Sequence, residues 1–276
     1  MVTGKSPPTA WLLALAGALA CEPNVVDAVK EPPPMMMEPE PTPVSPLETS
    51  LIHRYSFDGE GTLAVDSKFA AHGDVVGTTL AGDGTLLLLG EQSTQYVNLP
   101  NRLISGLTDA TFEAWLTWHG GGAWQRIFDF GNNSAGEDLL GSTGTSYLFL
   151  TTSSGTDATR MPPTAMRASF STNGVDDEEI CHGTSPFPID TPTHVALVVD
   201  QVNQLMTLYL DGALHQACEL TRPLSLIDDV NNWLGHSNYM ADVDLAASYD
   251  EFRIYNAALT AEELADSFAA GPDARH

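Results

Sequence analysis

The chain has 276 residues and a formal net charge of −25 at pH 7, from 36 acidic and 11 basic side chains. A surface this acidic repels phosphate backbones and anionic membranes, so nucleic-acid binding through a basic face is excluded. Hydrophobic residues make up 43% of the chain. That fraction is too high for a disordered acidic polymer, so the composition predicts a folded protein.

The first 21 residues have the layout of an export signal. Lys5 supplies a positive charge, and an apolar run over residues 10–20 ends at Cys21. The run is shorter than the about 20 apolar residues that span a bilayer, so it predicts a cleaved signal peptide. Two products are consistent with it. One is ordinary secretion; the other is a lipoprotein of bacterial type, tethered to the envelope only through lipid on Cys21.

Residues 22–50 predict a disordered linker. They contain eight prolines and several acids, without a periodic apolar face. Such sequence forms an extended, semi-rigid spacer. We therefore expect one folded domain over residues 51–276, held away from the membrane if Cys21 is lipidated.

Two further cysteines, Cys181 and Cys218, complete the set of three. An even pair in an exported chain favours a disulfide bond between them. The alternative is a pair of buried free thiols. No His and Asn constellation accompanies either cysteine in the sequence, so a catalytic thiol has no support.

From residue 51 onward the pattern is typical of β-strands. Short apolar or alternating runs recur between turn signals, which indicates a sandwich or a barrel. The predicted strands are Leu51–Phe57, Thr85–Leu89, Gln95–Leu99, Ala110–Trp118, Gln125–Phe130, Ser146–Thr152, Met166–Thr172, His194–Asp200, Leu205–Leu210, Leu214–Leu220 and Ser248–Tyr255.

Two local signals are stronger than the rest. Asp211-Gly212 separates two apolar runs, which predicts a tight β-hairpin. Near the end of the chain, Thr260 and Glu263 have the spacing of a capping box. The sequence therefore predicts one C-terminal helix that begins after Thr260 and stops at Gly271.

Four blocks of sequence resemble a known family. Leu51–Asp58, Ala110–Trp115, Trp124–Gly131 and Tyr249–Thr260 are similar, in order, to segments of LamG-like jelly-roll domains of the concanavalin A-like lectin/glucanase superfamily. The resemblance implies an all-β, two-sheet antiparallel jelly-roll sandwich. It also implies a structural calcium ion and binding of carbohydrate or cell-surface partners, although the fold alone does not determine the ligand.

Asp250 is the first candidate metal ligand. It shares strand parity with Phe252 and Ile254, so we expect its carboxylate to point toward the apolar side of the strand. A buried charge needs compensation, which an oxygen-coordinated calcium ion would supply. The resemblance places the first and last strands side by side. Asp58 is then a plausible second ligand, and Asp66 a weaker third.

Other interpretations of Asp250 stay open. The residue can lie in a solvated turn, or it can form a salt bridge with Arg54 or Arg253. Either arrangement would remove the need for a metal ion.

Aromatic residues beside a glycine loop suggest a sugar-stacking platform. Trp118 and Trp124 flank the glycines at 120–122. Both tryptophans also share parity with core-type residues, so packing in the core is the favoured interpretation. Arg126 has the same parity as Trp124 and would then need an acidic partner.

Trp115 and Tyr239 are the two candidate ligand-binding residues. Trp115 lies on the opposite parity from the core residues of its strand, so it is either an exposed platform or a packing residue. Tyr239 lies in a loop with Asp242, and loops at the end of a sandwich commonly carry binding function.

An enzyme is not expected. The histidines lack metal-ligand spacing, and no nucleophile elbow is present. Glucanases of this superfamily carry their carboxylates as E-x-D-x-E on one strand, whereas Glu113 stands alone and Asp250 and Glu251 are adjacent. We therefore expect an exported, non-catalytic binding module for a glycan or cell-surface protein. The alternative is a structural envelope domain that contacts another protein without recognising sugar.

Overall fold

In a computed structural model, the structure describes residues 45–91, 93–155 and 164–274. They belong to one compact unit that spans residues 43–276. The signal peptide, Cys21 and most of the expected linker lie outside the described residues, so those predictions stay predictions. Within the described part of the chain, no helix is long and apolar enough to cross a membrane.

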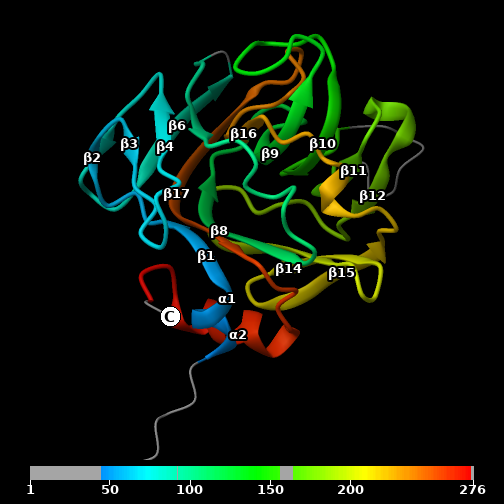
Figure 1. Cartoon of the computed structure of the whole chain (residues 1–276). Coiled ribbons are helices and arrows are strands. Elements are labelled where there is room, and N and C mark those ends of the chain that lie inside the picture. The colour runs from blue at the N-terminus through cyan, green and yellow to red at the C-terminus, as the bar shows by residue number, and fades with distance from the viewer. Residues whose placement is uncertain (1–44, 92, 156–163, 275–276) are drawn as a thin grey trace, which may run out of the picture. The chain divides into compact units, whose positions relative to one another are not determined.

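Two antiparallel sheets form the sandwich that the sequence predicts (Figure 1). The strands of the first sheet are β1 (Leu51–Tyr55), β6 (Leu86–Glu91), β8 (Ala110–Trp118), β13 (Pro192–Asp200), β14 (Leu205–Leu210), β15 (Ala213–Glu219) and β17 (Asp244–Tyr255). Their order is β1-β17-β8-β13-β14-β15, and β6 also pairs with β17. As expected, the first strand lies beside the last.

The second sheet has eight strands and carries the candidate site. Its members are β3 (Leu63–Ala64), β4 (Gly73–Val76), β7 (Tyr96–Leu99), β9 (Arg126–Asn133), β10 (Gly144–Thr151), β11 (Arg167–Ser171), β12 (Glu179–His182) and β16 (Asn231–Leu234). They run in the order β12-β11-β10-β9-β16-β7-β4-β3. A small separate ribbon pairs β2 (Glu60–Gly61) with β5 (Leu80–Ala81).

The core fills the space between the two sheets with alternate residues of each strand. Phe112 on β8 packs with its ring centroid 5.1 Å from that of Phe128 and 5.7 Å from that of Phe130 on β9. All three rings are buried. Full burial of one such side chain stabilises the fold by about 1.5–3 kcal/mol.

A disulfide bond joins the two sheets at one edge. Cys181 on β12 and Cys218 on β15 are bonded, with their Cα atoms 5.3 Å apart. β12 is the last strand of the second sheet and β15 the last strand of the first. The predicted pairing is confirmed, and the bond ties together two strands that share no backbone ladder.

The predicted hairpin and the C-terminal helix are both present. Asp211 and Gly212 have φ values of 48° and 71°, as the mirror-image turn between β14 and β15 requires. Helix α2 (Ala261–Ala270) begins with the complete capping box of Thr260 and Glu263.

The expected linker is wrong at its end. Residues 46–50 form a short helix, α1 (Pro46–Ser50), capped by Ser45. Leu47 is buried in a small cluster with Tyr255 and Leu264, and α1 lies beside α2 in Figure 1. The folded part of the chain therefore begins at least six residues before position 51, because an apolar side chain anchors it.

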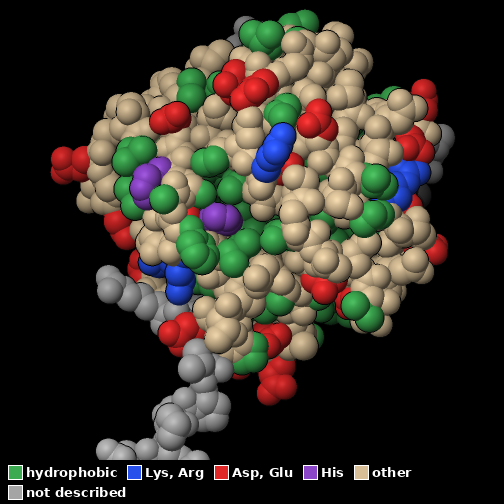
Figure 2. All heavy atoms as spheres, viewed as in Figure 1, with side chains coloured by type: hydrophobic (Ala, Val, Ile, Leu, Met, Phe, Trp, Pro, Cys, Tyr) green, Lys and Arg blue, Asp and Glu red, His purple; other side chains and the backbone are tan. Residues whose placement is uncertain are grey.

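Charge is distributed over the surface. Figure 2 shows the acidic side chains of one face scattered singly or in small groups, with few Lys and Arg side chains among them. The net charge of −25 therefore does not mark one concentrated site on this face.

Candidate functional site

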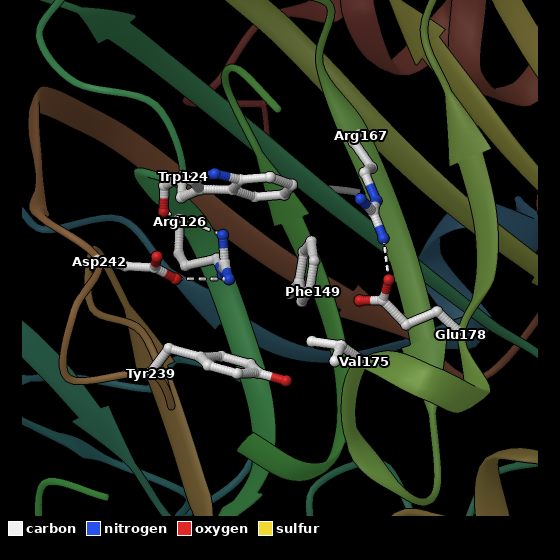
Figure 3. Close-up of a pocket in the computed structure, with 8 residues that line it drawn as sticks. All are labelled: Trp124, Arg126, Phe149, Arg167, Val175, Glu178, Tyr239 and Asp242. Atoms are coloured by element: carbon white, nitrogen blue, oxygen red, sulfur yellow. Dashed lines mark hydrogen bonds and ion pairs between the residues drawn. The ribbon is translucent and has the colours of Figure 1, made fainter. Parts of the chain in front are cut away.

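The candidate site is a hollow on the outer face of the second sheet. Leu148 and Leu150 of β10 point into the core, so Tyr147 and Phe149, which alternate with them, point outward. The hollow has a volume of about 250 Å³ and is shown in Figure 3. Its lining residues are Trp124, Arg126, Phe149, Arg167, Val175, Glu178, Tyr239 and Asp242.

Two chain segments form the opposite walls. One is the loop over residues 235–243, which supplies Tyr239 and Asp242. Asn238 fastens this loop to the sheet: its side-chain amide donates to Asp129 Oδ1 at 2.9 Å, and its backbone amide donates to Asp129 Oδ2 at 3.0 Å. The other wall is the 3₁₀ turn Gly174–Asp177 together with the following Glu178.

Arg126 lies at the base of the hollow, and its side chain is only 2% exposed. Its guanidinium group donates to Asp242 Oδ2 at 2.7 Å, to Asp129 Oδ2 at 3.2 Å and to the Trp124 carbonyl at 2.9 Å. The guanidinium carbon also lies 3.9 Å from the centroid of the Phe149 ring. The acidic partner expected for Arg126 is therefore present twice.

Arg167 mirrors this arrangement on the other side. It forms an ion pair with Glu178 and donates from Nε to Ser169 Oγ at 2.7 Å. Its guanidinium carbon lies 5.2 Å from the centroid of the Trp124 ring. Two buried arginines thus face the hollow, each held by a carboxylate.

A chain of hydroxyl groups connects the two walls. Tyr239 donates to the Tyr147 hydroxyl at 3.0 Å, and Tyr147 donates to Glu178 Oε1 at 2.9 Å. Burial raises the pKa of Tyr239 to about 12, so its phenol stays protonated at neutral pH. Burial also raises the pKa of Asp242, against the opposing effect of Arg126.

The hollow therefore combines aromatic faces with fixed polar groups. In Figure 3, Trp124 and Tyr239 lie on opposite sides, with Phe149 between them. Carboxylate oxygens of Asp242 and Glu178 accept hydrogen bonds, while the two arginines donate them. This combination suits a ligand with apolar ring faces and several hydroxyl groups.

Of the two predicted ligand-binding residues, only Tyr239 lines this hollow. Trp115 is on the outer face of the first sheet, 7% exposed. Its ring lies 4.5 Å from the ring of His194 and 4.5 Å from the guanidinium carbon of Arg253. Trp115 also borders a separate cavity of about 300 Å³ on the first sheet. The interpretation of Trp115 as an exposed platform is wrong, because its side chain is buried.

Strand parity misplaced Trp124, which is only partly buried and lines the hollow. Trp118 is buried as expected, and its indole donates to Gln125 Oε1 at 2.5 Å. Trp124 has φ of 69°, a left-handed conformation that breaks the alternation and turns its ring into the hollow. In the sequence, the glycine loop at residues 120–122 was the signal that regular strand geometry is interrupted near Trp124.

Asp250 does not point into the core. Tyr249 pairs with Leu116 and Glu251 pairs with Trp115, so Asp250 is the extra residue of a β-bulge. The bulge reverses the parity on which the expectation rested, and the side chain is half-buried beside the Trp115 cavity.

The surroundings of Asp250 are acidic. Burial raises the pKa of its carboxyl, and the negative charges of Asp273 and Asp58 raise it further. The salt bridge considered for Asp250 is absent, because Arg54 and Arg253 both pair with Glu251 instead.

Asp66 has a different role from the one expected. His53 Nδ1 lies 2.8 Å from Asp66 Oδ2. The carboxylate also accepts four backbone amides, those of Arg54, Lys68, Phe69 and Ala71. These donors occupy its lone pairs. Among the described residues, no three His, Cys, Asp or Glu side chains are grouped as a metal site.

Solved structures of several other proteins share the fold at low identity. Domain 4 of AbnA, an extracellular arabinanase from Geobacillus stearothermophilus in complex with arabinotriose, matches with a TM-score of 0.57 and 17% identity, over 79% of this chain and 97% of that domain. Trypanosoma rangeli sialidase, in complex with 2,3-difluorosialic acid, matches with a TM-score of 0.57 and 16% identity, over 80% of this chain and 33% of the sialidase. The binding domain of botulinum neurotoxin DC, in complex with rat synaptotagmin II, matches with a TM-score of 0.57 and 12% identity, over 81% of this chain and 52% of the toxin chain.

At these identities the likeness shows the fold alone. A search of curated proteins found no match. The family model of the concanavalin A-like lectin/glucanases superfamily matches residues 91–265, which is more than half of the chain. The matched segment contains β8 to β17 and every residue that lines the hollow. The chain therefore belongs to the concanavalin A-like lectin/glucanases superfamily.

Proposed function

We propose that this protein is an exported, non-catalytic binding module that takes carbohydrate in the hollow on the second sheet. The observation that carries the proposal is the hollow itself, in which Trp124, Phe149 and Tyr239 surround two fixed arginine–carboxylate pairs. Similar folds bind carbohydrate in other proteins: AbnA domain 4 is in complex with arabinotriose.

The chemistry of the lining supports a sugar ligand. The apolar face of a sugar ring can stack on an aromatic side chain, while its hydroxyl groups both donate and accept hydrogen bonds. Asp242 and Glu178 would accept from hydroxyl groups, and the guanidinium groups beside them would donate. Asp242 and Glu178 are each ion-paired with a buried arginine, and this arrangement supports a binding role for them.

Export rests on the leader sequence and on the disulfide bond. A bond between Cys181 and Cys218 persists in an oxidising compartment outside the cytoplasm. A tether through lipid on Cys21 is part of the proposal, and intact-mass measurement of the mature protein tests it directly. A mass without added lipid would leave a secreted module.

A structural calcium ion at Asp250 is the second part of the proposal. The half-buried carboxylate of Asp250 has negative neighbours in Asp58 and Asp273, and a bound cation would relieve their mutual repulsion. Asp58 and Asp250 would supply carboxylate oxygens, the ligands that calcium prefers. Asp66 is left out, because its oxygens are taken by His53 and the backbone amides around it.

A glycan array tests the binding function. The full chain is expected to bind a restricted set of glycans in a saturable manner. Trp124→Ala should remove this binding, whereas Phe69→Ala should retain it, because Phe69 is exposed and lies outside the hollow. Uniform silence of the folded wild-type protein would contradict the proposal and favour the protein-contacting envelope domain. Release of reducing ends from polysaccharides would instead indicate an enzyme.

A further inference from the structure

We infer that the hollow is one half of an extended site for a neutral oligosaccharide of at least two sugar units. The inference rests on the proposed function and specifies its ligand class. It comes from a second hollow next to the first, and from the charge balance around both.

The second hollow has a volume of about 280 Å³ and shares Val175 and Tyr239 with the first. Its lining residues are Thr143, Gly144, Thr145, Asn173, Gly174, Val175, Asp176 and Tyr239. Each hollow by itself is smaller than the about 300–1,000 Å³ of common ligand pockets. Together they form a longer site with Tyr239 and Val175 at its middle.

Tyr239 is held at this junction by several contacts. Its hydroxyl donates to Tyr147, and its ring lies edge-on to the Tyr147 ring with centroids 5.7 Å apart. The side chain also needs a glycine beneath it. A Cβ atom at Gly144 would lie 2.6 Å from Tyr239 Cε2 and 2.9 Å from Tyr147 Cδ1. Gly144 therefore leaves the space that the Tyr239 ring occupies, at the boundary between the two hollows.

The two hollows differ in chemistry. The first has three aromatic side chains, whereas the second has only Tyr239 and otherwise presents hydroxyl, amide and carboxylate groups from Thr143, Thr145, Asn173 and Asp176. One sugar unit would stack in the first hollow. The next unit would be held in the second through hydrogen bonds to its hydroxyl groups.

The charges around the site favour a neutral ligand. In the first hollow and directly beneath it, Arg126 and Arg167 face three carboxylates, those of Asp129, Asp242 and Glu178. The positive charges of both arginines are thus already balanced by protein carboxylates. The described lining of the second hollow contains no basic residue. An anionic sugar would have to displace a protein carboxylate from a buried arginine, which leaves that carboxylate uncompensated.

Titration calorimetry with oligosaccharides of one to four units tests the inference. The probes are arabino-, xylo-, cello- and manno-oligosaccharides, with sialyllactose as the anionic comparison. In any series that binds, affinity should rise about tenfold or more between one unit and two or three units. Sialyllactose should bind more weakly than the best neutral probe.

A variant that fills the second hollow isolates its contribution. Thr145 is exposed and lines that hollow, so Thr145→Trp should remove the gain with length and leave the affinity for one unit unchanged. Val202→Trp is the control, because Val202 is 80% exposed in the turn between β13 and β14, on the other sheet. Melting curves of both variants establish that they fold.

Three results would overturn the inference. Equal affinity for one and three units, or an unchanged gain with length in Thr145→Trp, would show that the second hollow takes no sugar. Tighter binding of sialyllactose would show that the ligand is anionic. In each of these cases sugar still binds, so the proposed function stands. Silence of the wild-type chain toward all probes and on the glycan array would contradict both.

Discussion

Replacing Arg126 tests whether the base of the hollow is held by charge compensation. Arg126→Met keeps most of the apolar stem but removes the guanidinium group, which lies over Phe149 and contacts Asp129 and Asp242. Asp129 is fully buried, so its charge would lose a buried partner. Removing one partner of a buried ion pair costs about 3–5 kcal/mol of unfolding free energy. For a domain of this size that loss lowers Tm by roughly 6–20 °C.

The deficit should depend on pH in a defined direction. Burial raises the pKa of Asp242, and Arg126 opposes that rise; without Arg126 the pKa of Asp242 rises further. A carboxyl group whose pKa is higher in the folded than in the unfolded state contributes to the free energy of unfolding. This contribution is fully present below the unfolded-state pKa and is lost as pH rises through the folded-state pKa. The deficit of Arg126→Met is therefore largest at neutral pH, and it shrinks as pH falls through the raised pKa of Asp242.

Urea unfolding followed by circular dichroism, at several pH values, measures this effect. Arg102→Met is the matched control, because Arg102 is exposed and a surface substitution of this kind changes stability by about 0.5 kcal/mol or less. A loss below about 1 kcal/mol in Arg126→Met would refute the reasoning. So would a deficit that stays constant on acidification.

Three further predictions concern the fold and the other sheet. Replacing both Cys181 and Cys218 with Ser should cost about 4 kcal/mol in urea unfolding, given their separation of 37 residues; a wild-type protein equally stable with and without reductant would contradict this. In chelator, Asp250→Asn should stabilise the protein at neutral pH by less than about 1 kcal/mol, because it removes repulsion by Asp58 and Asp273. That gain should vanish as pH falls through the raised pKa of Asp250. Added calcium should raise the Tm of the wild type but not that of Asp250→Asn. A wild-type Tm that does not change with calcium would contradict the proposed calcium site. Trp115→Ala should cost about 3–5 kcal/mol of stability but leave glycan affinity within about twofold, and a large loss of affinity at intact fold would relocate the site.

Local pattern predicted most of the sandwich. The strands at residues 110–118 and 205–210 have the predicted bounds, because each is a run rich in apolar, aromatic and β-branched residues that ends at turn signals. β4, β12 and β16 were missed: each has only four residues, and strands this short give a weak period-two pattern. Leu47 was missed for a different reason, since its burial depends on α2, more than two hundred residues away.

The candidate site was predicted less well, for two physical reasons. A bulge at Asp250 and the left-handed backbone of Trp124 both break strict alternation, and parity arguments fail at such residues. The pairing of Arg126 with Asp242 joins residues 116 apart in sequence. It depends on how the loop over residues 235–243 folds over the sheet, which periodicity does not encode.

A crystal structure of the chain with its strongest array ligand tests the central claim most directly. The account predicts a sugar ring stacked on Trp124, with hydroxyl groups hydrogen-bonded to Asp242 and Glu178 and a second unit beyond Tyr239. These are the residues that the two hollows already present. A ligand bound instead in the cavity beside Trp115, or at any place away from the second sheet, would contradict it.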